Sequence, residues 1–475
     1  MLRRKIEEDF DRFLKGPKRE ALLVTGARQV GKTFSIRQFG KRSFRDFVEI
    51  NFIERPDAKA LFDGTRGRTD FFTRFSAFVG RELPEGETLV FFDEVQECPE
   101  IVTFIKFLGD DARYRYVLSG SLLGVELRDI RSVPVGYLRE VDMYPLDFEE
   151  FVRANGLPDS VIEHIRKSCE DRQGMDSVID GKMMELLRLY LVVGGMPAAV
   201  QVYLDTNDIP AVIREQQAIL VQYRKDAAKY DERDKTEIVR TMELIPSELN
   251  GQNKRFYVNA LRPGERFERV NDNFVWLEKA GIALPVYNVE SPRLPIELAK
   301  KANLFKLFFN DVGLLACLYM DGIQFRILSG EIDVNFGAVY ENFVAQELRA
   351  HGFGKLYYFN SKKHGEVDFL VEHDGTVLPI EAKSGRDYDL HAALDNMLAE
   401  PQFRLEKAYV LNGQCACSTS GKVTYLPIYA LMFLRRNPLP ERLIYKVDLS
   451  ALNSKPASTG FCGRVCRKGR RSDII

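Results

Sequence analysis

The sequence has no excess of charge of either sign. Its 68 lysines and arginines are balanced by 69 aspartates and glutamates, which leaves a formal net charge of −1. A chain balanced in this way exerts no whole-molecule attraction on nucleic acid or on an anionic membrane. Any such partner would have to be recognised by a local patch.

The sequence also lacks long hydrophobic runs and a regular set of cysteines. Its first ten residues are charged and contain no apolar core of a secretory signal. Apolar runs such as residues 191–200 are too short and too rich in glycine to span a bilayer, so no membrane partner is expected. Seven scattered cysteines do not make a disulfide framework. Cys415 and Cys417 are too close for a usual zinc pair, and Cys462 and Cys466 have no histidine cluster nearby. A reducing, cytoplasmic location is expected.

What the sequence does contain is a globular composition and one distinctive loop near its start. Hydrophobic residues make up 45% and charged residues 29%, and the length corresponds to roughly three or four domains of ~100–200 residues each. The stretch Gly26-Ala-Arg-Gln-Val-Gly-Lys-Thr33 fits the pattern G-x-x-x-x-G-K-[ST]. It follows a short apolar segment, residues 21–25, and precedes a helical one, residues 34–39. This order of strand, loop and helix predicts a phosphate-binding loop.

Each part of this loop has a physical role in binding a triphosphate. Its two glycines permit backbone angles that turn N–H groups toward phosphate oxygens, and the following helix presents its positive end to the same anion. Lys32 is expected to reach the β- and γ-phosphates, and the Thr33 hydroxyl to bind Mg²⁺. The residues expected to bind ATP here are Gly26, Ala27, Arg28, Gln29, Val30, Gly31, Lys32 and Thr33.

Two further apolar segments end in polar side chains. Residues 88–92 lead into Asp93 and Glu94, as expected of a buried parallel strand whose carboxyl end faces the ligand. Asp93 is expected to orient Mg²⁺ and Glu94 to polarise the attacking water, which favours an ATPase over a kinase. The segment Tyr116-Val-Leu-Ser-Gly-Ser121 could bring Ser119 or Ser121 to the γ-phosphate or the water. An ordinary serine turn is the alternative, and both remain open.

These motifs resemble those of AAA-type ATPases of bacteria and archaea, in which a C-terminal region of unknown function follows the ATPase core. The resemblance extends in order along the chain to about residue 440, through residues 143–151, 191–200, 223–230, 276–281 and 305–315. It implies ATP and Mg²⁺ as cofactors, an ATPase core over residues 1–150, a helical lid over residues 151–232, and sites completed by a neighbouring subunit of a homo-oligomer.

One departure from this family concerns its arginine finger. Many members carry Gly-Arg shortly before the Tyr-Pro-Leu element, whereas this chain has Gly136-Tyr137. The finger therefore cannot be assigned by matching, and Arg128, Arg131 and Arg139 remain candidates.

Residues 233–330 have the pattern of a winged-helix module. An amphipathic helix from Ile238 to Leu249 precedes a second helix over residues 267–280, and residues 283–289 read as a strand that leads into a wing. Three arginines near the second helix could meet DNA phosphates, but glutamates are interspersed among them: Arg262, Glu265, Arg266, Glu268 and Arg269. A DNA reader and a protein-packing module are equally supported.

The most informative later segment is an apparent β-hairpin around Asp374-Gly375, within residues 331–445. If that dipeptide forms the turn, Asp368 lies opposite Glu381, and Lys383 lies on the same face. Two carboxylates this close repel each other unless a cation lies between them, so a second divalent metal is expected there, with Lys383 orienting a water or stabilising developing charge.

The pattern D…E-x-K is that of restriction-endonuclease-like folds, and the family resemblance implies the same fold. Glu341 matches the acidic residue of that fold's first helix, which adds it to Asp368 and Glu381 as a metal ligand. The alternative is an inert sheet in which Lys383 pairs with Glu366 across the strands.

The sequence therefore predicts an α/β fold: a P-loop NTPase parallel sheet with a helical lid, a winged-helix module and a C-terminal PD-(D/E)xK nuclease-like domain. Residues 446–475 form a basic tail expected to be disordered. The predicted function is Mg²⁺-dependent ATP hydrolysis, coupled to DNA binding or cleavage. The alternative is a nucleotide-operated protein-interaction switch with an inactive nuclease-like fold.

Overall fold

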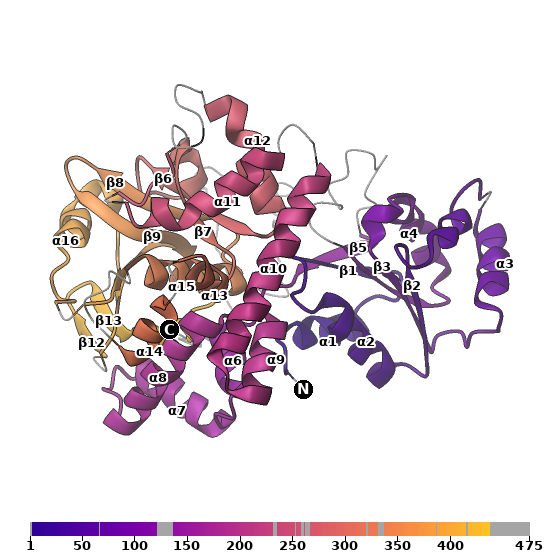
Figure 1. Cartoon of the computed structure of the whole chain (residues 1–475), viewed down its shortest axis with the longest axis horizontal. Helices are drawn as coiled ribbons and strands as arrows, with labels where there is room; N and C mark the ends of the chain where they lie inside the picture. The colour runs from indigo at the N-terminus through magenta and orange to yellow at the C-terminus, as the bar shows by residue number, and fades with distance from the viewer. Residues whose placement is uncertain are drawn as a thin grey trace, which may run out of the picture.

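The computed structural model describes residues 2–65, 67–120, 136–230, 235–251, 253–257, 261, 267–319, 322–330, 337–385, 387–414 and 417–437. Two β-sheets lie on either side of a group of helices (Figure 1). The smaller sheet belongs to the N-terminal part of the chain and the larger one to the C-terminal part. Ser121, Arg128, Arg131, Arg262, Arg266 and the tail over residues 446–475 lie outside the described residues.

Five parallel strands form the N-terminal sheet in the order β2-β3-β4-β1-β5. They are β1 (Ala21–Thr25), β2 (Asp46–Asn51), β3 (Thr88–Asp93), β4 (Arg115–Ser119) and β5 (Leu138–Asp142). Strands β1, β3 and β4 are buried along their whole length. This burial explains their continuous apolar sequences. The predicted parallel α/β sheet is confirmed.

Helices cover both faces of this sheet. They are α1 (Ile6–Lys15), α2 (Lys32–Ser43), α3 (Arg68–Val79) and α4 (Glu100–Asp111), with short 3₁₀ turns η1 (Pro56–Leu61) and η2 (Val95–Glu97). Leu22 of β1 joins the core formed with α1 and α2, whereas its neighbour Leu23 joins the core formed with α3 and α4. Successive side chains of a strand point to opposite faces, so one short apolar strand serves both cores.

The next segment consists of helices only. It contains α6 (Phe148–Ala154), α7 (Asp159–Glu170), α8 (Ser177–Val193), α9 (Pro197–Thr206) and α10 (Ile209–Tyr230). Helix α6 begins with a capping box, in which Asp147 and Glu150 each accept a hydrogen bond from the other's backbone N–H. The long helix α10 passes between the two sheets (Figure 1). The expected helical character over residues 151–230 is present, and the role of a lid remains a prediction.

The C-terminal sheet has eight strands in the order β12-β13-β11-β10-β9-β8-β6-β7. Its strands are β6 (Ala283–Val289), β7 (Lys300–Phe309), β8 (Leu356–Ser361), β9 (Gly365–His373), β10 (Thr376–Lys383), β11 (Ala408–Asn412), β12 (Ser418–Ser420) and β13 (Val423–Pro427). The accompanying helices are α11 (Lys235–Leu249), α12 (Phe267–Lys279), α13 (Val312–Leu318), α14 (Ile323–Ser329), α15 (Gly337–Ala350) and α16 (Ala392–Ala399). Three 3₁₀ turns complete it: η4 (Ile296–Ala299), η5 (Pro401–Phe403) and η6 (Ile428–Phe433).

Strands from both sides of the boundary expected at residue 330 lie in one sheet. Strand β6, which was expected to lead into the wing of a winged helix, pairs in parallel with β8 (Val286 beside Leu356). Together with β7 it forms one edge of the C-terminal sheet. Most of β6 is buried, and a buried strand needs a hydrogen-bonding neighbour on each side. A separate winged helix is therefore not confirmed.

The predicted hairpin is present with the predicted register. Strands β9 and β10 are antiparallel, Val371 lies opposite Leu378, and Asp374 and Gly375 both have positive φ angles (52° and 72°). Positive φ at both central residues matches the twist of the flanking strands, which favours Asp-Gly at this turn. In the described part of the chain, no helix combines the length and hydrophobicity needed to cross a bilayer.

Candidate nucleotide site and C-terminal acidic cluster

The loop between β1 and α2 contains two glycines with positive φ angles, and the first of them packs closely against Met143. Gly26 has a φ of +139°, and a Cβ atom placed there would lie 2.1 Å from the carbonyl oxygen of Met143. Gly31 has a φ of +96° and directly precedes α2. Only glycine meets both the angle and the space requirement at position 26. The two glycines of the sequence motif thus lie where the backbone of the loop has positive φ angles.

Lys32 folds back onto the loop. Its Nζ donates hydrogen bonds to the carbonyl oxygens of Gly26 and Ala27, at 3.0 and 2.8 Å. Burial lowers the pKa of Lys32 to about 8, although the nearby carboxylates of Glu94 and Asp93 act in the opposite direction. The ammonium is therefore partly removed from water and held by neutral carbonyl oxygens, which suits it to an anionic ligand.

The loop and the end of β3 meet at Asp93. The Thr33 hydroxyl donates to Asp93 Oδ2 at 3.0 Å, and the Ser119 hydroxyl donates to Asp93 Oδ1. Asp93 is buried at the carboxyl end of its strand. Ser119 thus contacts the carboxylate, an arrangement that neither sequence interpretation of this serine described.

The pairing of a threonine hydroxyl with a carboxylate fits a magnesium site. Both groups supply hard oxygen atoms, and Mg²⁺ in nucleotide sites typically takes one or two protein ligands and fills the rest of its shell with waters and phosphate oxygens. Thr33 and Asp93 would hold the ion. Their separation of 3.0 Å places both at the same corner of the loop.

Glu94, the predicted water activator, directly follows Asp93 in an unusual conformation. Its φ of 56° is left-handed, which is uncommon for a residue with a side chain and often found at functional sites. The Gln96 amide donates a hydrogen bond to its carboxylate. Glu94 is partly exposed beside the buried Asp93. The Glu94 carboxylate can therefore reach a water molecule, whereas the Asp93 carboxylate faces Thr33.

Sequence reasoning missed two residues at this site. Asn51, at the end of β2, donates from Nδ2 to Asp93 Oδ2 at 3.2 Å, while its own Oδ1 accepts the backbone N–H groups of Ile53 and Glu54. Its position at a strand end was a signal that could have found it. Arg4 lies in the N-terminal segment, where no motif indicated it.

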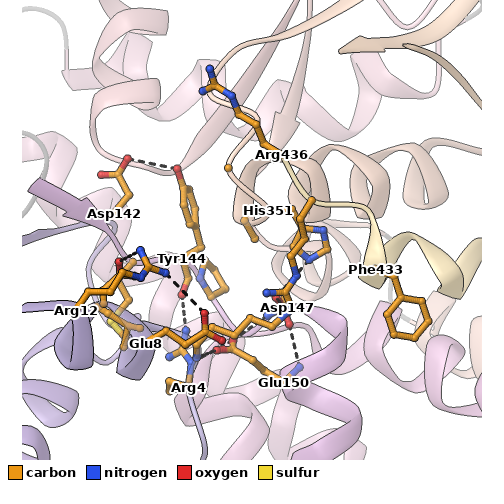
Figure 2. A pocket seen from close by; sticks show the side chains of 18 of the residues that line it. Arg4, Glu8, Arg12, Asp142, Tyr144, Asp147, Glu150, His351, Phe433 and Arg436 are labelled. Atoms are coloured by element: carbon orange, nitrogen blue, oxygen red, sulfur yellow. Dashed lines mark hydrogen bonds and ion pairs between the residues drawn. The ribbon is translucent and has the colours of Figure 1, made fainter. Parts of the chain in front are cut away.

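Arg4 connects the loop to the helical segment. Its guanidinium donates to the carbonyl oxygens of Val30 (2.9 Å) and Tyr144 (2.6 Å) and to the carboxylate of Glu150 (3.2 Å). Figure 2 shows Arg4 pointing toward Tyr144 and Glu150 at the edge of a cavity of about 550 Å³. The cavity lies between the N-terminal segment, the start of α6 and the end of α15, where His351 faces Asp147 at 3.3 Å.

Helix α10 and Gly281, which come later in the chain, contact the phosphate loop. The Arg28 guanidinium pairs with the Asp226 carboxylate of α10. Tyr223 of the same helix donates to the Arg28 carbonyl oxygen at 3.5 Å. Gly281 approaches the loop so closely that a Cβ atom there would lie 3.1 Å from Ala27. Two of the segments that carried the family resemblance, residues 223–230 and 276–281, therefore contact the phosphate loop.

Of the three arginine-finger candidates, the structure describes only Arg139. Arg139 of β5 donates to the carbonyl oxygen of Asp9 at 2.8 Å within the same chain. The other two candidates lie outside the described residues, so the finger of a neighbouring subunit remains a prediction.

The four residues predicted for the C-terminal site do come together. Glu341, Asp368 and Glu381 are all buried, and the Lys383 ammonium lies 2.9 Å from Glu381. Asp368 Oδ2 accepts the Ala382 N–H at 3.0 Å. The alternative pair of Lys383 with Glu366 is absent: Glu366 pairs instead with Lys306 at 2.7 Å.

Lys306 of β7 is the residue that the sequence did not predict for this cluster. Its ammonium lies 3.2 Å from Glu341 and 3.8 Å from Asp368, and Lys254 pairs with the other Glu341 oxygen. Burial disfavours charge on Lys306, but Glu341, Asp368 and Glu366 outweigh it and raise its pKa. Burial, Glu341 and Glu381 raise the pKa of Asp368 well above its usual range.

This arrangement does not fit the divalent metal expected at Glu341, Asp368 and Glu381. The mutual repulsion that motivated the expectation is relieved by lysine ammonium groups. In the described residues, no group of three or more histidine, cysteine, aspartate or glutamate side chains is arranged to hold a metal ion. A long lysine side chain from β7 reached the cluster because β7 and β9 belong to one sheet, which the sequence did not show.

Comparisons with known proteins agree with the N-terminal site. Residues 18–152 match the family model of an AAA domain. Residues 184–324 and 336–431 match the models of two domains of unknown function, DUF8612 and DUF4143. A comparison with curated proteins gave no match.

Solved structures that match include C. elegans PCH-2 and Drosophila ORC bound to DNA. The PCH-2 structure has 12% identity and a TM-score of 0.26 over 44% of this chain and 64% of that one. The ORC structure has 12% identity and a TM-score of 0.26 over 59% of this chain and 86% of that one. This chain thus spans less than two thirds of the PCH-2 chain, and neither likeness says what it does. Residues 18–152 therefore resemble an AAA domain, and the five-stranded parallel sheet agrees with that match.

Proposed function

We propose that this chain binds ATP with Mg²⁺ and hydrolyses it at the loop between β1 and α2. The contact between Thr33 and Asp93 supports this best, because it joins the phosphate loop to an acidic strand end at one point. The parallel strand order and the match to an AAA domain support the same function.

The roles follow from the chemistry of each group. Loop N–H groups and the start of α2 would bind the phosphate oxygens, and Lys32 would pair with the β- and γ-phosphates. Thr33 and Asp93 would hold Mg²⁺, which supplies charge neutralisation to the transferred phosphoryl group. Glu94 would accept a proton from the attacking water as general base.

Two substitutions separate binding from hydrolysis. In Lys32→Ala we expect nucleotide affinity to be lost, because the other cation of the loop, Arg28, is paired with Asp226 of α10 and cannot replace the Lys32 ammonium at the β- and γ-phosphates. In Glu94→Gln we expect binding to persist while turnover falls by roughly 10²–10⁴-fold, the usual contribution of a general base. Binding of a fluorescent ATP analogue and phosphate release would be measured on the same preparations.

Matched controls are available on the same elements. Lys41 is an exposed lysine in the last turn of α2, and Glu97 is a half-exposed glutamate in η2 that follows Glu94. Lys41→Ala and Glu97→Gln should leave binding and turnover at the parental level. Parental turnover in Glu94→Gln would show that the assignment of the water activator is wrong.

What the ATP cycle drives is a separate question. Contacts of Arg28 with α10 and of Ala27 with Gly281 support transmission from the loop to the rest of the chain. The lysine-filled acidic cluster favours a nucleotide-operated interaction switch over DNA cleavage. DNA binding without cleavage remains a prediction.

A filter-binding titration distinguishes the two outputs. Duplex and single-stranded DNA would be titrated at two salt concentrations, with and without ATP. Binding to phosphates weakens steeply as salt rises, because it releases counterions. Absence of binding at both salt concentrations would favour the interaction switch.

A further inference from the structure

The acidic cluster of the C-terminal sheet is built around a lysine. Lys306 is fully buried, and its ammonium lies 2.7 Å from Glu366, 3.2 Å from Glu341 and 3.8 Å from Asp368. The ring of Tyr358 lies 5.2 Å away and adds a cation–π contact. Strands β7, β8 and β9 and helix α15 all contribute to this environment.

A fully buried ammonium group is stable only if nearby groups offset the cost of removing its charge from water. Moving a lysine charge out of water costs several kcal/mol even after relaxation, so such a residue persists only with close partners of opposite charge. Here two carboxylates lie within hydrogen-bonding distance and a third lies close by. The cluster is therefore a specific site for a cation.

The charges of the cluster nearly balance without any added ion. Four carboxylates, those of Glu341, Glu366, Asp368 and Glu381, contact three ammonium groups, those of Lys254, Lys306 and Lys383. Both Glu341 oxygens, Glu366 Oε1 and Asp368 Oδ1 already contact lysines, and Asp368 Oδ2 accepts the Ala382 N–H, whereas Glu381 Oε2 is buried without a hydrogen-bond partner. A divalent ion held by these carboxylates would therefore lie close to a lysine ammonium. At that distance it would repel Lys306 in a low-dielectric interior, where such repulsion is strong.

We infer that the Lys306 ammonium takes the place of a divalent metal ion among Glu341, Glu366 and Asp368, so that the C-terminal domain does not cleave DNA by a metal-dependent route. The charge that neutralises the carboxylates is covalently part of the chain. This inference is independent of the proposed ATPase, because it concerns a cluster in the other sheet.

Manganese binding to the full-length chain tests the inference. Bound Mn²⁺ would be counted by electron paramagnetic resonance in the parent, in Asp368→Asn and in Lys306→Met, all without nucleotide. We expect the parent and Asp368→Asn to bind equal amounts. Lys306→Met removes the ammonium while keeping an unbranched chain, and we expect it to bind one additional Mn²⁺ per molecule. Lys306→Arg keeps the charge and should gain none.

Two results would overturn the inference. One is a metal-dependent property of the parent that Asp368→Asn abolishes. This property could be the binding of Mn²⁺ or the Mn²⁺-dependent nicking of plasmid DNA. The other is a folded Lys306→Met chain with no additional Mn²⁺. If Lys306→Met does not fold, the comparison of the parent with Asp368→Asn decides alone: equal Mn²⁺ binding and no nicking support the inference.

Discussion

At the scale of single residues, the nucleotide site depends on a lysine that is easily deprotonated. Lys32 contacts two backbone carbonyl oxygens and is largely removed from water, and its pKa is lowered to about 8. A bound triphosphate would favour the charged form and raise this pKa. ATP binding above pH 8 must then be accompanied by uptake of a proton.

This linkage predicts a pH-dependent affinity. ATP affinity should be constant below a pH of about 8 and fall by about tenfold per pH unit above it, until the pKa of the bound state is passed. Titrations of a fluorescent ATP analogue between pH of about 7.5 and about 9.5 would measure it. Lys32→Arg, whose guanidinium does not deprotonate, should show weaker but pH-independent binding. An unchanged parental affinity over this range would contradict the prediction.

Gly26 offers a second test at the residue scale, with a matched control. Gly26 and Gly67 have nearly the same φ angle, +139° and +142°, but a Cβ atom would clash with Met143 only at Gly26. Gly67→Ala should cost about 1–3 kcal/mol of unfolding free energy through backbone strain alone. Gly26→Ala should cost clearly more and abolish ATP binding. Equal losses in urea denaturation would show that the close approach to Met143 is unimportant.

At the scale of elements, helix α10 is tied to the phosphate loop. Asp226 is buried and pairs with Arg28, and Tyr223 contacts the Arg28 carbonyl oxygen. The pair joins residues 198 positions apart in the sequence. Such a contact can transmit a change in the loop to the helices beyond it.

A double-mutant cycle measures the strength of this tie. For Arg28→Met and Asp226→Asn we expect a coupling of about 1–2 kcal/mol, since the arginine is partly exposed and solvent screens part of the interaction. The exposed pair of Arg55 and Asp57, at 2.7 Å, serves as the control and should couple clearly more weakly, because solvent screens it on all sides. Similar couplings in chemical denaturation would show that α10 is only loosely joined to the loop.

Features that depend on a few consecutive residues were predictable from the sequence. The phosphate loop, the acidic end of β3 and the Asp374-Gly375 hairpin all follow from local patterns, because each depends on a few consecutive residues. Lys306 was not predictable, because it acts through strands that are distant in sequence, whereas Asn51 carried a local signal only in its position at the end of a strand. The same limitation hid the pairing of β6 with β8, which brings together residues that no local pattern connects.

At the scale of the whole molecule, the N-terminal residues, the start of α6 and the end of α15 meet at buried charges. Arg4 joins the phosphate loop to Glu150, and Lys5 pairs with Glu149 at 2.8 Å. Asp147 lies 3.3 Å from His351 of the C-terminal part, beside the cavity in Figure 2. Buried charged groups tolerate little displacement, because separation leaves a charge without a partner. The two ends of the molecule are therefore held in a defined relation through this junction.

The central claim is that the loop from Gly26 to Thr33 encloses the phosphates of ATP beside Asp93 and Glu94. A crystal structure of Glu94→Gln grown with ATP and Mg²⁺ tests it most directly. We predict a triphosphate surrounded by the loop N–H groups, Lys32 turned from the Gly26 and Ala27 carbonyl oxygens toward the phosphates, and Mg²⁺ at the Thr33 hydroxyl. A nucleotide bound elsewhere, with Lys32 still on those carbonyl oxygens, would contradict the account.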